Sequence, residues 1–179
     1  MYGGTISNNE STNKGGGGVT VWGGGLVTIA GGTISGNKAT ENGGGIYTNG
    51  TLTISGNSVI ENNEAGNGGG VFYYGTYSSS SMTISGSAKI AGNTATGNGG
   101  GIYFKNKGTL VMNGGSITGN TATGDGGGVY FGGDTFRISG NLDISGNKKA
   151  GADNNVYLPT DKYITIVGAL TGSKPIGVT

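Results

Sequence analysis

Residues 117–130 read ITGNTATGDGGGVY, and this stretch decides the fold because close variants of it recur along the chain. The same pattern occupies Ile34–Tyr47 and Ile90–Tyr103. One asparagine marks each repeat, with successive gaps of 28, 26, 30, 27 and 27 residues: Asn9, Asn37, Asn63, Asn93, Asn120 and Asn147. A recurring period of this size indicates a solenoid in which each repeat forms one coil.

Within one repeat, apolar and polar residues alternate with period two, which is typical of β-strands. Three apolar runs follow one another. The first is centred on an isoleucine such as Ile117, the second follows the glycine triplet, and the third is a pair such as Leu110 and Met112. Because such a coil gains a core only by stacking, we predict an all-β fold. It is a parallel β-helix (β-solenoid) of about six coils of 26–30 residues, with three strands per coil.

Glycine accounts for 44 of the 179 residues and proline for only 2. Glycine at this level, without proline and without a period of three, excludes a collagen triple helix. The net charge of +1 excludes the self-repulsion that keeps many weakly hydrophobic chains unfolded. The recurring glycine triplets and turns instead fit the corners of narrow coils, whose interior needs few apolar residues.

The sequence contains no histidine and no cysteine. This removes Ser-His and Cys-His nucleophile pairs, thiolate metal sites and the usual zinc ligand. A nearly neutral chain whose only arginine is Arg137 lacks the basic patch of a nucleic-acid-binding protein. No apolar run reaches the ~18 residues that span a bilayer. We expect no cofactor, no metal, no nucleic-acid partner and no membrane insertion by this segment.

Two rows of polar side chains are predicted to stack along the coils. The repeat asparagines form the first row, and the residues just before the glycine triplets form the second: Asn42, Asn67, Asn98 and Asp125. Stacked amides bond to one another and satisfy turn backbone groups. We therefore assign a structural ladder, without a catalytic role, to Asn37, Asn63, Asn93, Asn120 and Asn147.

Aromatic residues recur at an outward position of the strand that follows each glycine triplet. Two residues further along their strands, on the same predicted face, lie Trp22, Asn49, Tyr74 and Lys105. Such a row either stacks on itself and stabilises the coils or offers ring faces to a glycan or a partner protein. The candidate ligand-binding face comprises Trp22, Tyr47, Phe72, Tyr74, Tyr77, Tyr103, Tyr130 and Tyr157.

An insertion lies beside this face. Val71 to Met82 takes 11 residues where other coils use 6 to 8, and the insertion contains Tyr77 and the serines Ser78–Ser81. Insertions on repeat scaffolds often carry binding loops, although a serine-rich insertion is also easily tolerated.

The repeats are predicted to span residues 1–167, and residues 168–179 are predicted to form a partial cap or a linker to a following domain. Gly3–Ser7 has the register of Gly31–Ser35, so the chain opens within a coil. Because a bare terminal coil offers unpaired strand edges, we expect a fragment of a longer protein. We also expect end-to-end self-association through uncapped coils.

The repeat Ile-Ser/Thr-Gly-Asn-x-Ala-Thr-x-x-Gly-Gly-Gly-Ile/Val-Tyr resembles the repeats of polymorphic outer membrane proteins and of adhesin-like surface proteins of bacteria and archaea. The resemblance implies a right-handed parallel β-helix of the pectate-lyase (pectin lyase-like) type. It also implies an extracellular or cell-surface location, with the secretion signal and anchor outside this segment, and a role in adhesion or as a stalk.

We therefore expect a non-catalytic segment of a cell-surface adhesin-like protein, a rigid stalk or spacer that binds a carbohydrate or host surface protein along the aromatic face. The alternative is the β-helix domain of a polysaccharide-degrading lyase or glycoside hydrolase. Glycoside hydrolysis uses two carboxylates that face one cleft, and Glu41 and Glu61 are predicted not to converge. Asp134, Arg137 and Asp143 lie close in sequence and are expected to make a surface ion pair.

Overall fold

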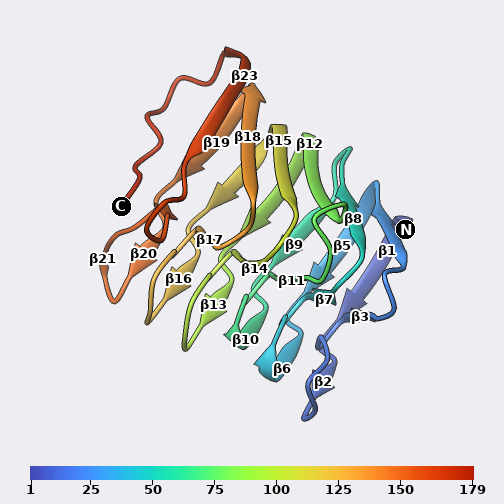
Figure 1. Cartoon of the computed structure of the whole chain (residues 1–179). Coiled ribbons are helices and arrows are strands. Elements are labelled where there is room, and N and C mark those ends of the chain that lie inside the picture. Colours follow the sequence, from blue (N-terminus) through green and yellow to red (C-terminus); the bar gives the residue numbers. More distant parts are fainter.

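The computed structural model describes all residues 1–179 and contains β-strands but no helix. In Figure 1 the coils lie side by side from β1 (Tyr2–Ser7) at the N-terminal end to β23 (Ile164–Leu170) at the other end. Equivalent strands of successive coils pair in parallel and form three sheets. The parallel β-helix predicted from the repeats is therefore confirmed.

The first sheet contains 10 strands. Besides β1 and β23 these are β4 (Leu26–Ile29), β5 (Gly31–Ser35), β8 (Thr51–Ile54), β9 (Val59–Glu61), β12 (Ser81–Ala91), β15 (Thr109–Thr118), β18 (Thr135–Gly140) and β19 (Leu142–Ser145).

The second sheet has seven short strands and the third sheet has six. The second sheet contains β2 (Glu10–Ser11), β6 (Lys38–Asn42), β10 (Glu64–Asn67), β13 (Thr94–Ala95), β16 (Thr121–Ala122), β20 (Lys148–Lys149) and β21 (Ala152–Asp153). The third sheet contains β3 (Val19–Val21), β7 (Ile46–Thr48), β11 (Val71–Gly75), β14 (Ile102–Asn106), β17 (Val129–Phe131) and β22 (Val156–Tyr157).

These sheets do not match the three predicted apolar runs one to one. The first and third runs both belong to the first sheet, and in β12 they form a single strand that passes through Gly86, where φ is 67°. The second sheet comes from the segment after each repeat asparagine, for which the sequence predicted no strand. Four of its strands bury one alanine each, such as Ala95 in β13, and no larger apolar residue, so no apolar pattern reveals them.

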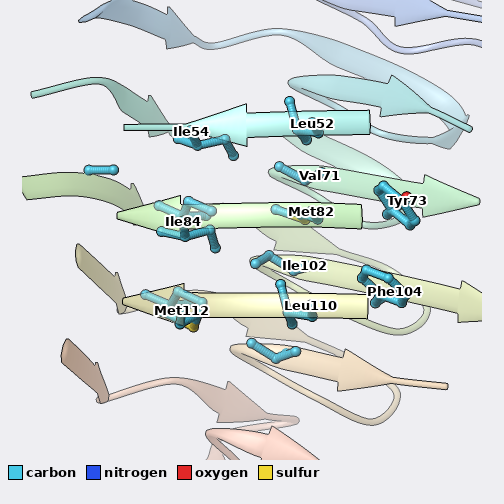
Figure 2. Packing of buried hydrophobic residues seen from close by; sticks show 14 of the residues in the cluster. Leu52, Ile54, Val71, Tyr73, Met82, Ile84, Ile102, Phe104, Leu110 and Met112 are labelled. Atoms are coloured by element: carbon cyan, nitrogen blue, oxygen red, sulfur yellow. The ribbon is translucent and has the colours of Figure 1, made fainter. Parts of the chain in front are cut away.

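The core consists of parallel columns of apolar side chains, which form one buried cluster of 25 residues. Figure 2 shows two columns on the first sheet, one made of Leu52, Met82 and Leu110 and the other of Ile54, Ile84 and Met112. Facing them, the third sheet contributes Tyr73, Phe104 and Phe131, and the ring centroids of Tyr73 and Phe104 lie 4.3 Å apart. The interior of the solenoid is therefore filled with side chains.

The alanine column of the second sheet ends at Lys149. Lys149 pairs in register with Ala122, and Ala150 is exposed, so Ala150 does not continue the column. The Lys149 ammonium instead reaches the Asp125 carboxylate, with Nζ and Oδ1 2.6 Å apart. The ion pair holds the lysine at a position that alanine fills in earlier coils.

The C-terminal residues turn back over the last coil. Gly168 to Leu170 belong to β23, whereas Val178 pairs with Val156 of β22. Leu158 N donates a hydrogen bond of 3.0 Å to the carbonyl of Thr179. Residues near the C-terminus thus add backbone pairing to the edge of the third sheet.

Candidate functional site

The repeat asparagines form a continuous hydrogen-bonded ladder inside the solenoid. Asn63 Nδ2 donates to Asn93 Oδ1 at 3.0 Å, and the backbone N–H of Asn63 donates to the same oxygen at 3.0 Å. The second amide hydrogen of Asn63 reaches the carbonyl of Ile34, also at 3.0 Å. These side chains are almost fully buried, and the pattern repeats at Asn37, Asn93, Asn120 and Asn147. The ladder satisfies buried polar groups, which is a structural role.

The second polar row also connects neighbouring coils. Asn98 N donates to Asn67 Oδ1 at 3.0 Å, and Asp125 N donates to Asn98 Oδ1 at 2.7 Å. This row runs along the corner between the second and third sheets, because each member directly precedes a glycine triplet. The first glycine of the triplet, such as Gly99 with φ 66°, then turns the chain into the third sheet.

Aromatic rings form a continuous row on the outer side of the third sheet. We call Trp22, Tyr47, Phe72, Tyr103, Tyr130 and Tyr157 the aromatic row. Successive ring centroids along it lie 4.5, 5.3, 5.2, 4.7 and 5.2 Å apart. The five strand positions from Tyr47 to Tyr157 are in register, so parallel pairing fixes the order of the rings.

The row is less exposed than the sequence predicted. Tyr47 and Phe72 keep only 5% and 3% of their surface accessible, whereas Trp22 and Tyr74 keep 55% and 37%. Trp22 packs on Tyr47, and Tyr74 stacks on Phe72 with centroids 6.5 Å apart. The prediction that Tyr47 and Phe72 offer their faces to a ligand is therefore wrong, because a second layer of rings covers them.

A depression of about 400 Å³ lies over this part of the row. Exposed rings, amides and charged side chains meet in it, and they come from the first four coils. Its lining consists of Lys14, Trp22, Glu41, Asn42, Tyr47, Asn67, Phe72, Tyr74, Tyr103 and Lys105. We call it the first depression.

A second depression of about 280 Å³ continues along the same face. It is lined by Tyr103, Lys105, Asn106, Tyr130, Gly132, Pro159 and Lys162. Tyr103 and Lys105 line both depressions, so the two are neighbours on one surface. The Lys105 ammonium lies 5.8 Å from the centroid of the Tyr74 ring, a distance at which a cation is attracted to the ring face.

The phenols on this face remain uncharged at neutral pH. Burial raises the pKa of Tyr47, Tyr103 and Tyr130 above the usual value, and the neighbouring Tyr74 adds to the rise at Tyr47. A neutral phenol both donates and accepts hydrogen bonds. Its hydroxyl can therefore bond to either kind of polar group on a ligand.

The structure does not bring Tyr77 to this site. Tyr77 is 62% exposed at the tip of the insertion and lines neither depression. Lys105, which the alternation places on the same face as Trp22 and Tyr74, lines both depressions. The sequence in turn missed Lys14 and Lys162, which come from segments far apart in the chain. Only the parallel register and the loop paths bring these lysines to the aromatic row, so no local pattern could have identified them.

Most carboxylates lie away from the aromatic row and have basic partners. Five of them form ion pairs with lysines: Glu61, Glu64, Asp125, Asp143 and Asp153. The ion pair expected for Arg137 does not form. Asp134 accepts a hydrogen bond from the backbone N–H of Gly108 at 2.9 Å, and Asp143 pairs with Lys174 at 2.8 Å. No group of three or more His, Cys, Asp or Glu residues is placed to hold a metal ion.

Residues 2–148 match the family described as the right handed beta helix region. No curated protein and no solved structure matches the chain. The structure has no helix of the length and apolar character needed to cross a membrane.

Proposed function

The chain belongs to the right-handed β-helix family, and from this premise we propose that it is a rigid, non-catalytic scaffold that binds carbohydrate in the first depression. The observation that carries the proposal is a pair of exposed rings: Trp22 packs at a tilt against the buried ring of Tyr47, and Tyr74 stacks on the buried ring of Phe72. The exposed rings of Trp22 and Tyr74 thus form an aromatic surface on the outer side of the third sheet, which we call the platform.

The chemistry around the platform suits a sugar. A pyranose ring presents C–H groups on its faces and hydroxyls around its edge, so it needs flat apolar surface with hydrogen-bonding groups beside it. The rings supply the surface. Asn42 and Asn67 line the same depression with amides, and Lys14 and Glu41 add charged groups. An aromatic floor with a few polar groups is typical of small-ligand sites.

The stack beneath the site supports a role as a spacer. Each coil is bonded to the next through three parallel sheets and through the asparagine ladder. Such a solenoid holds its surface groups in fixed positions along one axis. We propose that it presents the carbohydrate site at the surface of a cell or outside it, as part of an adhesin-like protein.

The carboxylates in the site favour binding over cleavage. Glycosidases use two carboxyl groups that flank the scissile bond. The first depression contains one, Glu41, and the second contains none. Glu10 and Glu64 line another shallow hollow on the second sheet, but Lys38 lies between their strands and pairs with Glu64 at 3.2 Å.

A glycan array tests the proposal. The parent chain is expected to bind a subset of glycans, and Trp22→Ala and Tyr74→Ala are each expected to weaken binding about tenfold, the equivalent of about 1.4 kcal/mol. Tyr77→Ala removes a more exposed tyrosine that lies outside the depressions and is expected to bind like the parent. If the parent binds no glycan, or if Tyr77→Ala weakens binding as much as Tyr74→Ala does, the proposal is wrong.

A further inference from the structure

The two depressions are parts of one longer surface. They share Tyr103 and Lys105, and the aromatic row runs beneath both. The row extends from Trp22, next to β3, to Tyr130 in β17, which lies four strands further along the third sheet. At about 4.8 Å per strand this is a length of about 20 Å. A surface of this length accommodates several sugar residues rather than one.

The charge on this surface is predominantly positive. Lys14 lines the first depression, Lys162 lines the second and Lys105 lines both, whereas Glu41 is the only carboxylate in either. None of these three lysines takes part in an ion pair. The lysines that do are Lys38, Lys89, Lys148, Lys149 and Lys174. In a chain of net charge +1, three of the four lysines that form no ion pair thus line the two depressions, and the fourth, Lys107, lines neither.

Lys105 occupies the centre of this arrangement. Its Nζ lies near the face of Tyr74, and its Cα is in register with Tyr74 across β11 and β14. The ammonium is therefore held beside an exposed ring at the junction of the depressions. A sugar stacked on that ring would place its ring substituents within reach of Nζ.

We propose that the ligand is an anionic polysaccharide that lies along the axis of the solenoid. Its acidic groups bond to Lys105, Lys14 and Lys162, and its sugar rings pack against the exposed rings of Trp22 and Tyr74. This inference rests on the carbohydrate-binding function proposed above. The recognised chemistry is a negatively charged substituent on a sugar ring, either the carboxylate of a uronic acid or a sulfate ester. Both accept charge-assisted hydrogen bonds from lysine.

Calorimetric titration of the full chain tests charge and length together. The probes are oligogalacturonides for carboxylate, heparin fragments for sulfate and cello-oligosaccharides as neutral chains, each as a short and a long oligomer. We expect one anionic series to bind more tightly than the neutral series, and long oligomers to bind more tightly than short ones. Raising NaCl from about 50 to about 300 mM is expected to weaken anionic binding because salt screens exposed charges.

Lysine variants locate the contacts. Lys105→Gln is expected to weaken binding of the anionic oligomers about fivefold to tenfold, and to weaken binding of the neutral oligomers much less. Lys162→Gln is expected to reduce the difference in affinity between the long and the short anionic oligomer. Lys89→Gln is the matched control, because Lys89 is a half-exposed lysine in β12 of the first sheet and lines neither depression. It is expected to bind like the parent.

The outcomes separate this inference from the proposed function. Preference for carboxylate or for sulfate supports the inference and identifies the acidic group. Equal, salt-independent binding of neutral and anionic chains overturns the anionic ligand and leaves the carbohydrate site standing. Binding that does not grow with oligomer length overturns the axial arrangement. If no glycan binds, the proposed function fails and the inference fails with it.

Discussion

At the scale of single residues, the third glycine of each triplet is explained by the asparagine of the next coil. A Cβ built on Gly101 would lie 3.0 Å from Asn120 Nδ2 and 2.6 Å from the carbonyl oxygen of Gly128. In the last coil this position is occupied by Asn155, whose Oδ1 accepts hydrogen bonds of 3.0 Å from both Asn147 N and Asn147 Nδ2. The Asn155 side chain thus provides the acceptor that a following ladder asparagine provides elsewhere.

The substitution Gly101→Ala tests this packing. The added methyl group must displace backbone of the next coil, so we expect the free energy of unfolding to fall by about 2 kcal/mol or more. Gly3→Ala is the control, because no atom lies within 4 Å of its Cβ and its φ is not in the left-handed region. Urea unfolding of both variants measures the difference. A Gly101→Ala variant as stable as the parent would show that the coils are not packed as described.

Tyr73 carries a buried hydroxyl that makes no hydrogen bond of good geometry, although the Ser80 side chain lies close to it. Burial raises the pKa of Tyr73 to about 12, against a smaller lowering effect of Ser80. Tyr73→Phe removes this hydroxyl, so we expect the stability at pH 7 to stay the same or rise by about 1 kcal/mol. In the parent, the unfolded chain ionises first, near pH 10. The contribution of Tyr73 to stability is therefore constant below pH 10 and falls as the pH rises from about 10 to about 12.

Urea unfolding at pH 7 and pH 11 checks both expectations for Tyr73. Tyr73→Phe should lose less stability than the parent between the two pH values. Tyr77→Phe should lose as much as the parent, because Tyr77 is exposed. A clear loss of stability in Tyr73→Phe at pH 7 would mean that the hydroxyl has a partner after all.

At the scale of elements, the apolar pattern identified the strands of the first and third sheets and missed those of the second sheet. Ile102 and Phe104 of β14 point inward and Tyr103 points outward, as period two requires. The second sheet was missed, because a strand with one inward alanine looks like a turn. The exposure of Tyr47 and Phe72 was also predicted wrongly. Alternation predicts on which side of the sheet a side chain lies. The burial of Tyr47 and Phe72 also depends on Trp22 and Tyr74, which cover their rings from outside.

The insertion before β12 is an element that can be removed. Thr76 to Ser79 are exposed, whereas Ser80 is buried and its carbonyl accepts a hydrogen bond from Thr109 N at 3.1 Å. Replacing residues 76–79 with two glycines is expected to change the free energy of unfolding by less than about 1 kcal/mol, because loop closure depends weakly on length. Thermal unfolding followed by circular dichroism measures this. Loss of cooperative unfolding would show that the insertion supports the coil.

At the scale of the whole molecule, the repeat period determines the order of the coils and therefore the aromatic row. That much follows from the sequence, because parallel stacking places equivalent residues next to one another. The two depressions could not be predicted from the repeat period. Their linings include Lys14 from an N-terminal loop and Pro159 and Lys162 from the segment after β22, and these residues lie outside the repeated positions.

The fluorescence of one side chain, Trp22, tests the central claim that the first depression binds carbohydrate. Trp22 is the single tryptophan of the chain, it is 55% exposed, and it lines the first depression. We predict that titration with the glycans that bind on the array changes Trp22 fluorescence saturably, and that Tyr74→Ala shifts the midpoint to about tenfold higher concentration. Trp22 emission that stays constant while those glycans bind, or that saturates equally in Tyr74→Ala, would contradict the account.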